Sequence, residues 1–423
     1  MRANRFVVLT AWCMVSACLA HAQGLPRARP EDVGLSTVAL ERIRPVLQAQ
    51  VDSGKFAGVV MAVARHGKLA YVESVGLMDI AHATPMRADA VFQICSMTKP
   101  VTAAAVLQLV ERGKLRLDDP VSKFIPAFAN VMVYAGGPAA HPALRDPERP
   151  ITIANLLTHT SGLTYGLFGN TPVDTIYRGA NLMPGERTIA QFADSAARLP
   201  LMFSPGSAWN YGVSLDVLGR VIEVVSGTSF DRYLHDELFV PLRMDETAFR
   251  GRPDLDARLA TLYVRGPDGR LVANPGPLCG DSRPVAKILA GGAGLFSTPG
   301  DYLRFAQMLL NGGELDGKRV LKRETVAMMT RNQLPPAIAR IPKNALGMEG
   351  YGQGFGGAVL VDSVAAGIPG APGIYRWWGY AETYFWVDPK ADLIALMWTQ
   401  FVPGRPELPL AFQRLVYGAV TGK

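Results

Sequence analysis

The sequence predicts an α/β protein of the α+β kind, in which helices flank an antiparallel sheet and a mainly helical region is inserted into the chain. β-Rich runs occur early, at 57–65 and 69–75, and return between 294 and 399. Between 96 and 290, apolar residues recur mostly at helical spacing and strand patterns are scarce. The two ends of the chain are therefore expected to share one sheet.

This pattern divides the chain into two structural parts. We expect residues 23–95 and 291–423 to form an α/β sheet domain, and residues 96–290 to form a helical region with the functional site at the interface. A chain of 423 residues is long for one core, which favours one large or two interleaved domains. The chain is 49% hydrophobic and 19% charged, as is typical of a folded globular protein.

Residues 1–22 have the pattern of a signal peptide. Two arginines precede an apolar run at 6–19, and an Ala-His-Ala cleavage pattern ends at Ala22. Export to the periplasm or the medium is the expected consequence. An alternative is that Val-Ser-Ala-Cys at 15–18 is a lipoprotein signal, which would leave an anchor on Cys18.

The N-terminal elements follow from periodicity. Apolar residues at close to helical spacing predict one helix from Ser36 to Ser53. The two β-rich runs that follow are joined by His66-Gly67, which is typical of a hairpin, so we interpret His66 as a turn residue. A further helix is expected from Ser96 to about Arg112, ending at Gly113.

The remaining elements are shorter. Helical patterns occur at 121–124, 152–157, 189–197 and 214–226, and a closing helix is expected at about 410–420. Segments 130–150 and 163–187, rich in Gly, Pro and Asn, are expected to be long loops. Strands are expected at 294–297, 356–361, 375–378, 384–387 and 393–399, and the turn-rich residues 388–392 predict a hairpin between the last two.

Composition excludes several function classes. The formal net charge is +7, but the basic residues are scattered without a stripe, which gives nucleic-acid binding little support. No segment after the leader approaches 18 apolar residues, so we expect no transmembrane span. No clustered His and Cys spacing suggests a metal, and no cofactor is expected.

The chain after the leader contains two cysteines, Cys95 and Cys279. They could form a disulfide, but we favour the interpretation that Cys95 is a small buried residue.

The first candidate site is the pair Ser96 and Lys99. Their spacing places both side chains on one helix face, so that an amine lies beside a hydroxyl. Lysine can take the serine proton when burial or neighbouring charge lowers its pKa. Pro100 fits only the first turn of a helix, which places Ser96 at the helix N-terminus, where developing negative charge is favoured. The alternative is an ordinary helix cap beside a solvated lysine.

Two further residues have chemical potential. Tyr211 lies on an aromatic-rich turn before a helix, and a phenol beside a cation such as Lys99 can relay protons. His159, in Leu-Thr-His-Thr-Ser-Gly, would suit a Ser-His-Asp triad, but the chain has no G-x-S-x-G elbow. We therefore interpret His159 as a residue that braces a loop.

Taken together, these motifs resemble the serine β-lactamase and penicillin-binding protein superfamily, especially the class C-like branch that includes the family VIII carboxylesterases. The likeness runs in order over residues 30–400. It rests on Ser96-Met-Thr-Lys99, residues 110–120, residues 156–163, Trp209-Asn-Tyr211, residues 291–302, and Trp378-Gly-Tyr380 before Val387-Asp-Pro389.

The resemblance implies a β-lactamase-like fold and assigns roles to the candidate residues. Ser96 would be the acylated nucleophile, Lys99 its base or proton shuttle, and Tyr211 the group that passes the proton to the leaving group. The oxyanion hole would use the backbone N–H of Ser96 and that of Ala381 or Tyr380. Whether the lysine or the tyrosine is the base stays open.

Two departures separate this chain from the penicillin-recognising enzymes of the superfamily. Tyr211-Gly-Val lacks the asparagine of Y-x-N, and Trp378-Gly379-Tyr380 replaces K-T-G, whose lysine holds a substrate carboxylate. An aromatic pocket, lined also by Trp377, Tyr165 and Phe168, suits a neutral group. Arg376 could restore a cation nearby, so these departures weaken the expectation of β-lactam turnover without excluding it.

The expected function is that of an exported serine hydrolase, a carboxylesterase that forms an acyl-Ser96 intermediate on a small-molecule ester or amide. A β-lactamase, a D-Ala-D-Ala carboxypeptidase or an aminopeptidase-type amidase is the alternative within the same fold. A non-catalytic penicillin-binding or sensor module is the alternative of another class. The natural acyl group and the oligomeric state stay open.

Overall fold

The computed structural model describes residues 24–182, 187–249, 252–274, 288–343, 345–402 and 407–421. The expected signal peptide at 1–22, the alternative lipidation site at Cys18, and Cys279 lie outside these residues. Among the described residues, no helix is long and apolar enough to cross a membrane.

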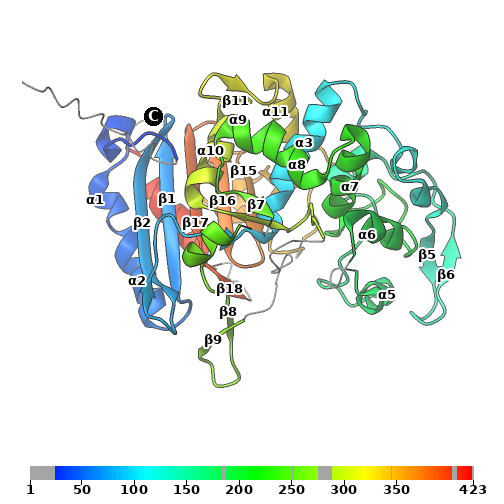
Figure 1. Ribbon diagram of the computed structural model, residues 1–423, viewed down its shortest axis with the longest axis horizontal. Helices are drawn as coiled ribbons and strands as arrows, with labels where there is room; N and C mark the ends of the chain where they lie inside the picture. The colour runs from blue at the N-terminus through cyan, green and yellow to red at the C-terminus, as the bar shows by residue number, and fades with distance from the viewer. Residues whose placement is uncertain are drawn as a thin grey trace, which may run out of the picture.

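Strands from both ends of the chain form one sheet. Within the described residues it has eight strands in the order β13-β14-β15-β16-β17-β1-β2-β3, and every neighbouring pair is antiparallel. The strands are β1 (Gly58–Arg65), β2 (Lys68–Asp79), β3 (Thr84–Pro85), β13 (Tyr351–Gln353), β14 (Ala358–Leu360), β15 (Tyr375–Gly379), β16 (Thr383–Asp388) and β17 (Leu393–Trp398). In Figure 1 the blue strands β1 and β2 lie directly beside the orange strands of the C-terminal part.

Both expected hairpins are confirmed. His66 and Gly67 turn β1 into β2 with φ angles of 51° and 72°. Asp388 begins the turn between β16 and β17, where its side chain accepts the amides of Lys390 and Ala391 at 2.9 and 3.1 Å.

Helices cover the two faces of this sheet. Successive residues of β16 point to opposite faces. Phe385 packs against Tyr302 of α10 (Pro299–Leu310), and Trp386 packs against Phe412 of α13 (Glu407–Gly418). α10 and α13 therefore lie on opposite sides of the sheet. α2 (Ile43–Asp52) packs against both β2 and α13.

The single helix expected at 36–53 is wrong in one respect. The segment forms two helices, α1 (Thr37–Leu40) and α2, with a break at residues 41–42. Pro45 has no N–H to donate to the carbonyl of Glu41, so the first helix cannot run through into the second.

The helical region surrounds α3 (Thr98–Glu111), which is buried along nearly its whole length and packs against α7 (Ser214–Ser226). A 3₁₀ turn at Cys95–Met97 leads into α3, so Ser96 stands at its N-terminus as expected. Two expected loops contain regular structure. Segment 130–150 holds the strand pair β5 (Val133–Gly136) and β6 (Ala143–Arg145), and segment 163–187 holds α5 (Pro172–Ala180).

Local hydrogen bonding explains the second of these errors. Thr171 and Asp174 form a capping box at the start of α5, and Pro172 occupies the first turn. In a Gly-, Pro- and Asn-rich segment this N-terminal signal outweighs the loop-like composition. The cyan-green elements β5, β6, α5 and α6 (Ile189–Ala196) project together on the right of Figure 1.

The remaining elements are short. They are η1 (Pro30–Val33), η3 (Val121–Lys123), η4 (Pro126–Asn130), α4 (Ile153–Leu157), α6 (Ile189–Ala196), α8 (Phe230–Leu234), a π-helical turn (His235–Phe239), α9 (Val240–Leu242), η6 (Pro253–Arg258), α11 (Arg323–Met329), α12 (Ser363–Ala366), β4 (Phe92–Gln93), β7 (Ala248–Phe249), β8 (Tyr263–Arg265), β9 (Leu271–Ala273), β10 (Leu295–Ser297), β11 (Glu314–Leu315), β12 (Lys318–Arg319) and β18 (Phe401–Val402).

Candidate active site

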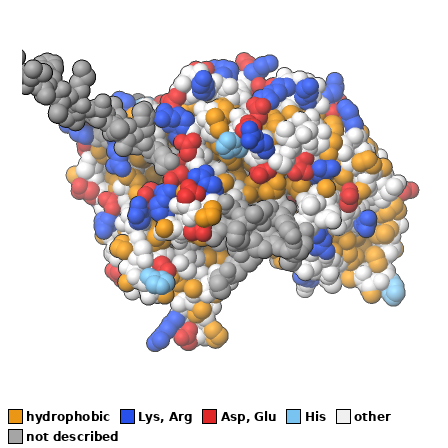
Figure 2. Space-filling view, in the orientation of Figure 1, with side chains coloured by type: hydrophobic (Ala, Val, Ile, Leu, Met, Phe, Trp, Pro, Cys, Tyr) orange, Lys and Arg blue, Asp and Glu red, His pale blue; other side chains and the backbone are white. Residues whose placement is uncertain are grey.

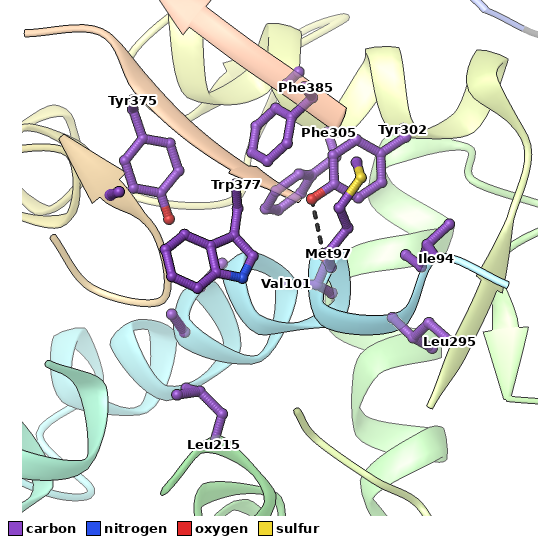
Figure 3. Close-up of a cluster of buried hydrophobic side chains, with 14 of the residues drawn as sticks. Ile94, Met97, Val101, Leu215, Leu295, Tyr302, Phe305, Tyr375, Trp377 and Phe385 are labelled. Carbon is purple, nitrogen blue, oxygen red and sulfur yellow. Dashed lines mark hydrogen bonds between the residues drawn. The ribbon is translucent and has the colours of Figure 1, made fainter. Parts of the chain in front are cut away.

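The turn that carries Ser96 is fixed by three neighbouring segments. Ile94 donates its amide to the carbonyl of Leu295 at 3.1 Å, and its own carbonyl accepts the Thr383 hydroxyl at 3.2 Å. The Tyr302 hydroxyl donates to the Met97 carbonyl at 2.9 Å, as the dashed line in Figure 3 marks. Two strands and one helix therefore hold the backbone on both sides of Ser96.

Cys95, directly before Ser96, adopts a left-handed conformation with φ 45°. Our preference for an unbridged buried thiol is wrong, because Cys95 is disulfide-bonded.

Ser96, Lys99 and Tyr211 meet at one point. Lys99 Nζ donates to Ser96 Oγ at 2.9 Å, and the Tyr211 hydroxyl donates to the same oxygen at 2.7 Å. Lys99 is fully buried and Tyr211 is 7% exposed. Two proton carriers from α3 and from the turn before α7 thus flank one hydroxyl, which is the geometry that activation of a serine requires.

Lys99 has the electrostatics of a base. Burial lowers the pKa of its ammonium group to about 7, although the negative charge of Asp216 acts in the opposite direction. Near neutral pH a large fraction of Lys99 is therefore the free amine. Its Nζ also donates to the Gly292 carbonyl at 2.7 Å, which fixes its position beside Ser96.

Asp216, on α7, is the charged residue that the motifs did not single out. It is buried, and its carboxylate accepts the Gly292 amide at 2.8 Å and the Tyr165 hydroxyl at 3.1 Å. Burial raises the pKa of this carboxyl group, and the charge of Lys99 opposes that rise. A sequence signal did exist, because an aspartate stands between Leu215 and Val217 on the apolar face of a helix.

Gly292 links Lys99 to Asp216. A Cβ atom at this position would lie 2.4 Å from Asp216 Oδ2 and 2.6 Å from the Tyr165 hydroxyl, so only glycine fits. The Thr102 hydroxyl holds the segment by donating to the Gly291 carbonyl at 2.6 Å. The amine and the carboxylate therefore approach the same residue, one through its carbonyl and one through its amide.

Tyr211 lies among aromatic rings. Burial raises the pKa of its phenol above the ordinary value, and the hydrogen bond to Ser96 acts in the opposite direction. The ring contacts Trp377 and Phe168 at centroid distances of 5.7 and 5.5 Å, and Lys99 Nζ lies 4.7 Å above it. The Tyr211 phenol therefore stays protonated near neutral pH, where it can donate a proton but does not act as a base.

His159 supports Tyr211 from behind. The imidazole is buried, its ring centroid is 4.9 Å from that of Tyr211, and its Nδ1 accepts the Gly212 amide at 3.5 Å. Burial lowers the pKa of His159 well below its ordinary value, so the ring is neutral. These contacts fit the loop-bracing interpretation of His159.

The expected substrate residues divide into two groups. Trp378, Gly379 and Tyr380 line a cavity of about 380 Å³ together with Phe168. The other two are packed behind the cluster of Ser96, Lys99 and Tyr211: Trp377 is buried against Tyr211, and Tyr165 is held by Asp216.

Gly379 brings this wall close to the turn that carries Ser96. A Cβ atom there would lie 2.3 Å from the Ile94 carbonyl oxygen, so β15 can approach the Ser96 turn only at a glycine. Beyond it, Glu382 donates its amide to the Gly379 carbonyl at 3.0 Å and closes a tight turn that contains Ala381. Outside helices and strands, the backbone hydrogen bonds of the described residues include none donated by the Ala381 amide.

No group of three or more His, Cys, Asp or Glu side chains in the described ranges could hold a metal ion. On the face seen in Figure 2, basic and acidic side chains are interspersed rather than gathered by sign.

Comparisons with known proteins agree with this fold. Protein Rv1367c of Mycobacterium tuberculosis is 36% identical over 365 residues, which cover 83% of this chain and 88% of that protein. Esterase EstB of Burkholderia gladioli is 33% identical over 384 residues, with coverage of 85% and 89%. The solved structure of EstCE1, a hydrolase with promiscuous acyltransferase activity, matches with a TM-score of 0.77 at 27% identity and covers 90% of this chain and 99% of EstCE1.

A family model described as Beta-lactamase matches residues 43–418, which include the whole of the site and all eight strands of the sheet. This is the superfamily that the Ser-x-x-Lys, Tyr and Trp-Gly motifs resemble. The chain therefore belongs to the Beta-lactamase family, whose fold it shares.

Proposed function

We propose that this protein hydrolyses small-molecule carboxylic esters through an acyl-Ser96 intermediate. The observation that carries the proposal is the contact of one serine hydroxyl with a buried amine at 2.9 Å and a phenol at 2.7 Å, where the pKa of the amine is about 7. The family assignment makes a serine hydrolase of this fold the expected class. The esterase EstB is a supporting relative.

In the proposed acylation step, Ser96 Oγ attacks the ester carbonyl and its proton passes to the neutral amine of Lys99. The amides of Ser96 and Ala381 stabilise the oxyanion. When the tetrahedral intermediate collapses, Tyr211 gives its proton to the departing alkoxide and recovers one from Lys99. Lys99 is the base because burial lowers its pKa towards neutrality while burial raises that of Tyr211.

Deacylation uses the same groups in reverse. Water takes the place of the alcohol, Lys99 and Tyr211 remove its proton, and attack on the acyl carbonyl releases the acid and restores Ser96. An alcohol in place of water would give acyl transfer, which is the second candidate. The similarity to EstCE1, a hydrolase with promiscuous acyltransferase activity, favours it.

The cavity favours esters over β-lactams. At the position where penicillin-recognising enzymes keep a lysine, this chain has Trp378, whose ring cannot pair with a carboxylate. The test compares p-nitrophenyl butyrate with nitrocefin at equal enzyme concentration, and adds a panel of peptides ending in D-Ala-D-Ala.

We expect ester turnover to exceed β-lactam and peptide turnover by about 10²-fold or more in kcat/KM, and Ser96→Ala to abolish it. Comparable nitrocefin turnover would favour a β-lactamase instead. Failure of the wild-type protein to turn over any substrate would favour a non-catalytic module. Addition of a primary alcohol gives the corresponding ester if acyl transfer occurs.

We also propose that residues 1–22 direct export and are then removed. The mature protein should begin with a free amine on Gln23 and should be recovered from the periplasm or the medium. N-terminal mass analysis distinguishes this from a lipid-modified Cys18, which would contradict cleavage after Ala22.

A further inference from the structure

Phe168, on the segment before α5, connects two sides of the site. Its ring centroid lies 5.5 Å from that of Tyr211 and 6.3 Å from that of Tyr380, which stands on the turn after β15. The ring also contacts Tyr165 at a centroid distance of 6.1 Å. Phe168 therefore spans from the phenol that hydrogen-bonds to Ser96 to the turn at the end of a sheet strand.

Phe168 is the exposed ring beside Tyr211. It is 47% exposed. The other described rings that contact Tyr211 are buried or half-buried, namely those of His159, Trp209, Trp377 and Tyr165. A group that extends outward from the Tyr211 hydroxyl therefore meets Phe168 before it reaches solvent.

Phe168 also borders the cavity of about 380 Å³. Tyr380 lines this cavity as well, but Ser96, Lys99 and Tyr211 do not. The rings of Phe168 and Tyr380 meet edge to face, with an interplanar angle of 79°. Because Phe168 has the cavity on one side and Tyr211 on the other, this ring pair separates the cavity from Ser96.

The loop that carries Phe168 is held by Arg178 of α5. Arg178 Nη1 donates to the Gly166 carbonyl at 2.6 Å and to the Gly169 carbonyl at 3.1 Å. Gly166 has a φ of 73°, and a Cβ atom there would lie 2.7 Å from the Asp174 carbonyl oxygen, so the loop requires a glycine at this point. One guanidinium therefore fixes the backbone on both sides of Phe168.

We propose that Phe168 is a specificity-determining residue that limits the size of the alcohol half of the ester. The proposal rests on ester hydrolysis at Ser96, in which Tyr211 protonates the departing alkoxide. The alkoxide oxygen must lie within hydrogen-bond reach of the Tyr211 hydroxyl, so the rest of the alcohol extends towards Phe168. A small alcohol stays on the near side of this ring, whereas a larger one requires the cavity behind it.

The test compares esters that differ in only one half. The alcohol pair is p-nitrophenyl butyrate and 4-methylumbelliferyl butyrate, whose phenols are similar in acidity but differ by one fused ring. The acyl pair is p-nitrophenyl butyrate and p-nitrophenyl octanoate. The wild-type protein is assayed beside Phe168→Ala and Phe168→Tyr. Leu167→Ala is the matched control, because Leu167 is the neighbouring apolar residue, is 68% exposed and does not line the cavity.

For the wild-type protein, we expect kcat/KM for p-nitrophenyl butyrate to exceed that for the umbelliferyl ester by about tenfold or more. Phe168→Ala should narrow this difference by about tenfold and should change the ratio within the acyl pair by less than about threefold. Phe168→Tyr keeps the ring and should retain the difference, as should Leu167→Ala. Absence of the difference in the wild-type protein, its persistence in Phe168→Ala, or an equal change in the acyl pair would overturn the proposal while leaving ester hydrolysis intact.

Arg178 is a positioning residue that acts through Phe168. Arg178→Met releases both carbonyls, so it should narrow the difference within the alcohol pair, but by less than Phe168→Ala does. The double variant Phe168→Ala/Arg178→Met should give the same ratio as Phe168→Ala, because no ring is left for the guanidinium to position. A further change of the ratio in the double variant would contradict this role.

A binding measurement separates the size limit from the chemistry. Calorimetric titration with 4-methylumbelliferyl butyrate is carried out on Ser96→Ala and on Ser96→Ala/Phe168→Ala, neither of which can form acyl-Ser96. The dissociation constant should be lower in the double variant by about tenfold or more, while that for p-nitrophenyl butyrate should change by less than about threefold. Equal affinities of the two variants for the umbelliferyl ester would reject the proposal, whatever the esterase assay shows.

Discussion

Replacement of Asp216 by asparagine tests the proposal that Lys99 acts as the base. Asparagine keeps the shape of the side chain and can still accept the Gly292 amide, but it carries no charge. Lys99 and Asp216 approach Gly292 through its carbonyl and its amide, at 2.7 and 2.8 Å. The substitution therefore removes one negative charge close to the amine with little change in geometry.

The magnitude follows from Coulomb's law. Two hydrogen bonds and the backbone of one residue put the charges roughly 6 Å apart. At an effective dielectric constant of about 20 the interaction amounts to about 3 kcal/mol, or about 2 pH units. Because Asp216 stabilises the charged form of Lys99, its removal lowers the pKa of Lys99 from about 7.

The assay follows kcat/KM for p-nitrophenyl butyrate by pH-stat across about pH 4.5 to 9. The acidic limb reports the base of the free enzyme, so it should lie near pH 7 in the wild-type protein and move down by about 2 units in Asp216→Asn. Asp174→Asn is a matched control, because Asp174 is equally buried but hydrogen-bonds to Thr164 and Thr171. A limb that stays in place, or moves to higher pH, would refute the assignment of Lys99 as the base.

Three further substitutions test other parts of the site. Tyr211→Phe should lower kcat by about 10²-fold or more with little change in KM, because the proton relay to the leaving group is lost; near-normal steady-state rates would remove the phenol from the mechanism. Gly379→Ala should lower both activity and melting temperature, because the new methyl group would lie 2.3 Å from the Ile94 carbonyl oxygen. Gly418→Ala is the control and should change neither, because no atom lies within 4 Å of the added methyl group. Trp378→Lys should raise the ratio of nitrocefin to ester turnover by about tenfold or more, because it supplies a carboxylate partner; a constant ratio would separate the tryptophan from substrate choice.

The parts of the fold that were predicted well depend on local signals. Strand alternation with turn residues located the β1–β2 and β16–β17 hairpins, and the proline after Lys99 located the start of α3. Errors arose where a short hydrogen-bonding signal competed with composition, as in the α5 capping box formed by Thr171 and Asp174. The break before α2 is also a local effect, because Pro45 lacks an N–H and interrupts an otherwise helical pattern.

The site could be predicted only in part, because most of its contacts join segments far apart in the chain. Ser96 and Lys99 are three residues apart, and that spacing alone placed them together. The Lys99 contact with Gly292 spans 193 residues, and spacing carries no information about it. The position of Asp216 on the apolar face of a helix was a sequence signal of burial, but its contacts with Gly292 and Tyr165 join segments far apart in the chain and could not be predicted.

The central claim is that Ser96 becomes covalently modified during catalysis. The most direct measurement is the reaction of the mature protein with a fluorophosphonate, followed by peptide mass spectrometry and a parallel assay of ester hydrolysis. We expect one phosphonate per chain on the peptide that contains Ser96, loss of activity in proportion to labelling, and no label on Ser96→Ala. Loss of activity with Ser96 unmodified, or undiminished ester hydrolysis by Ser96→Ala, would contradict the account.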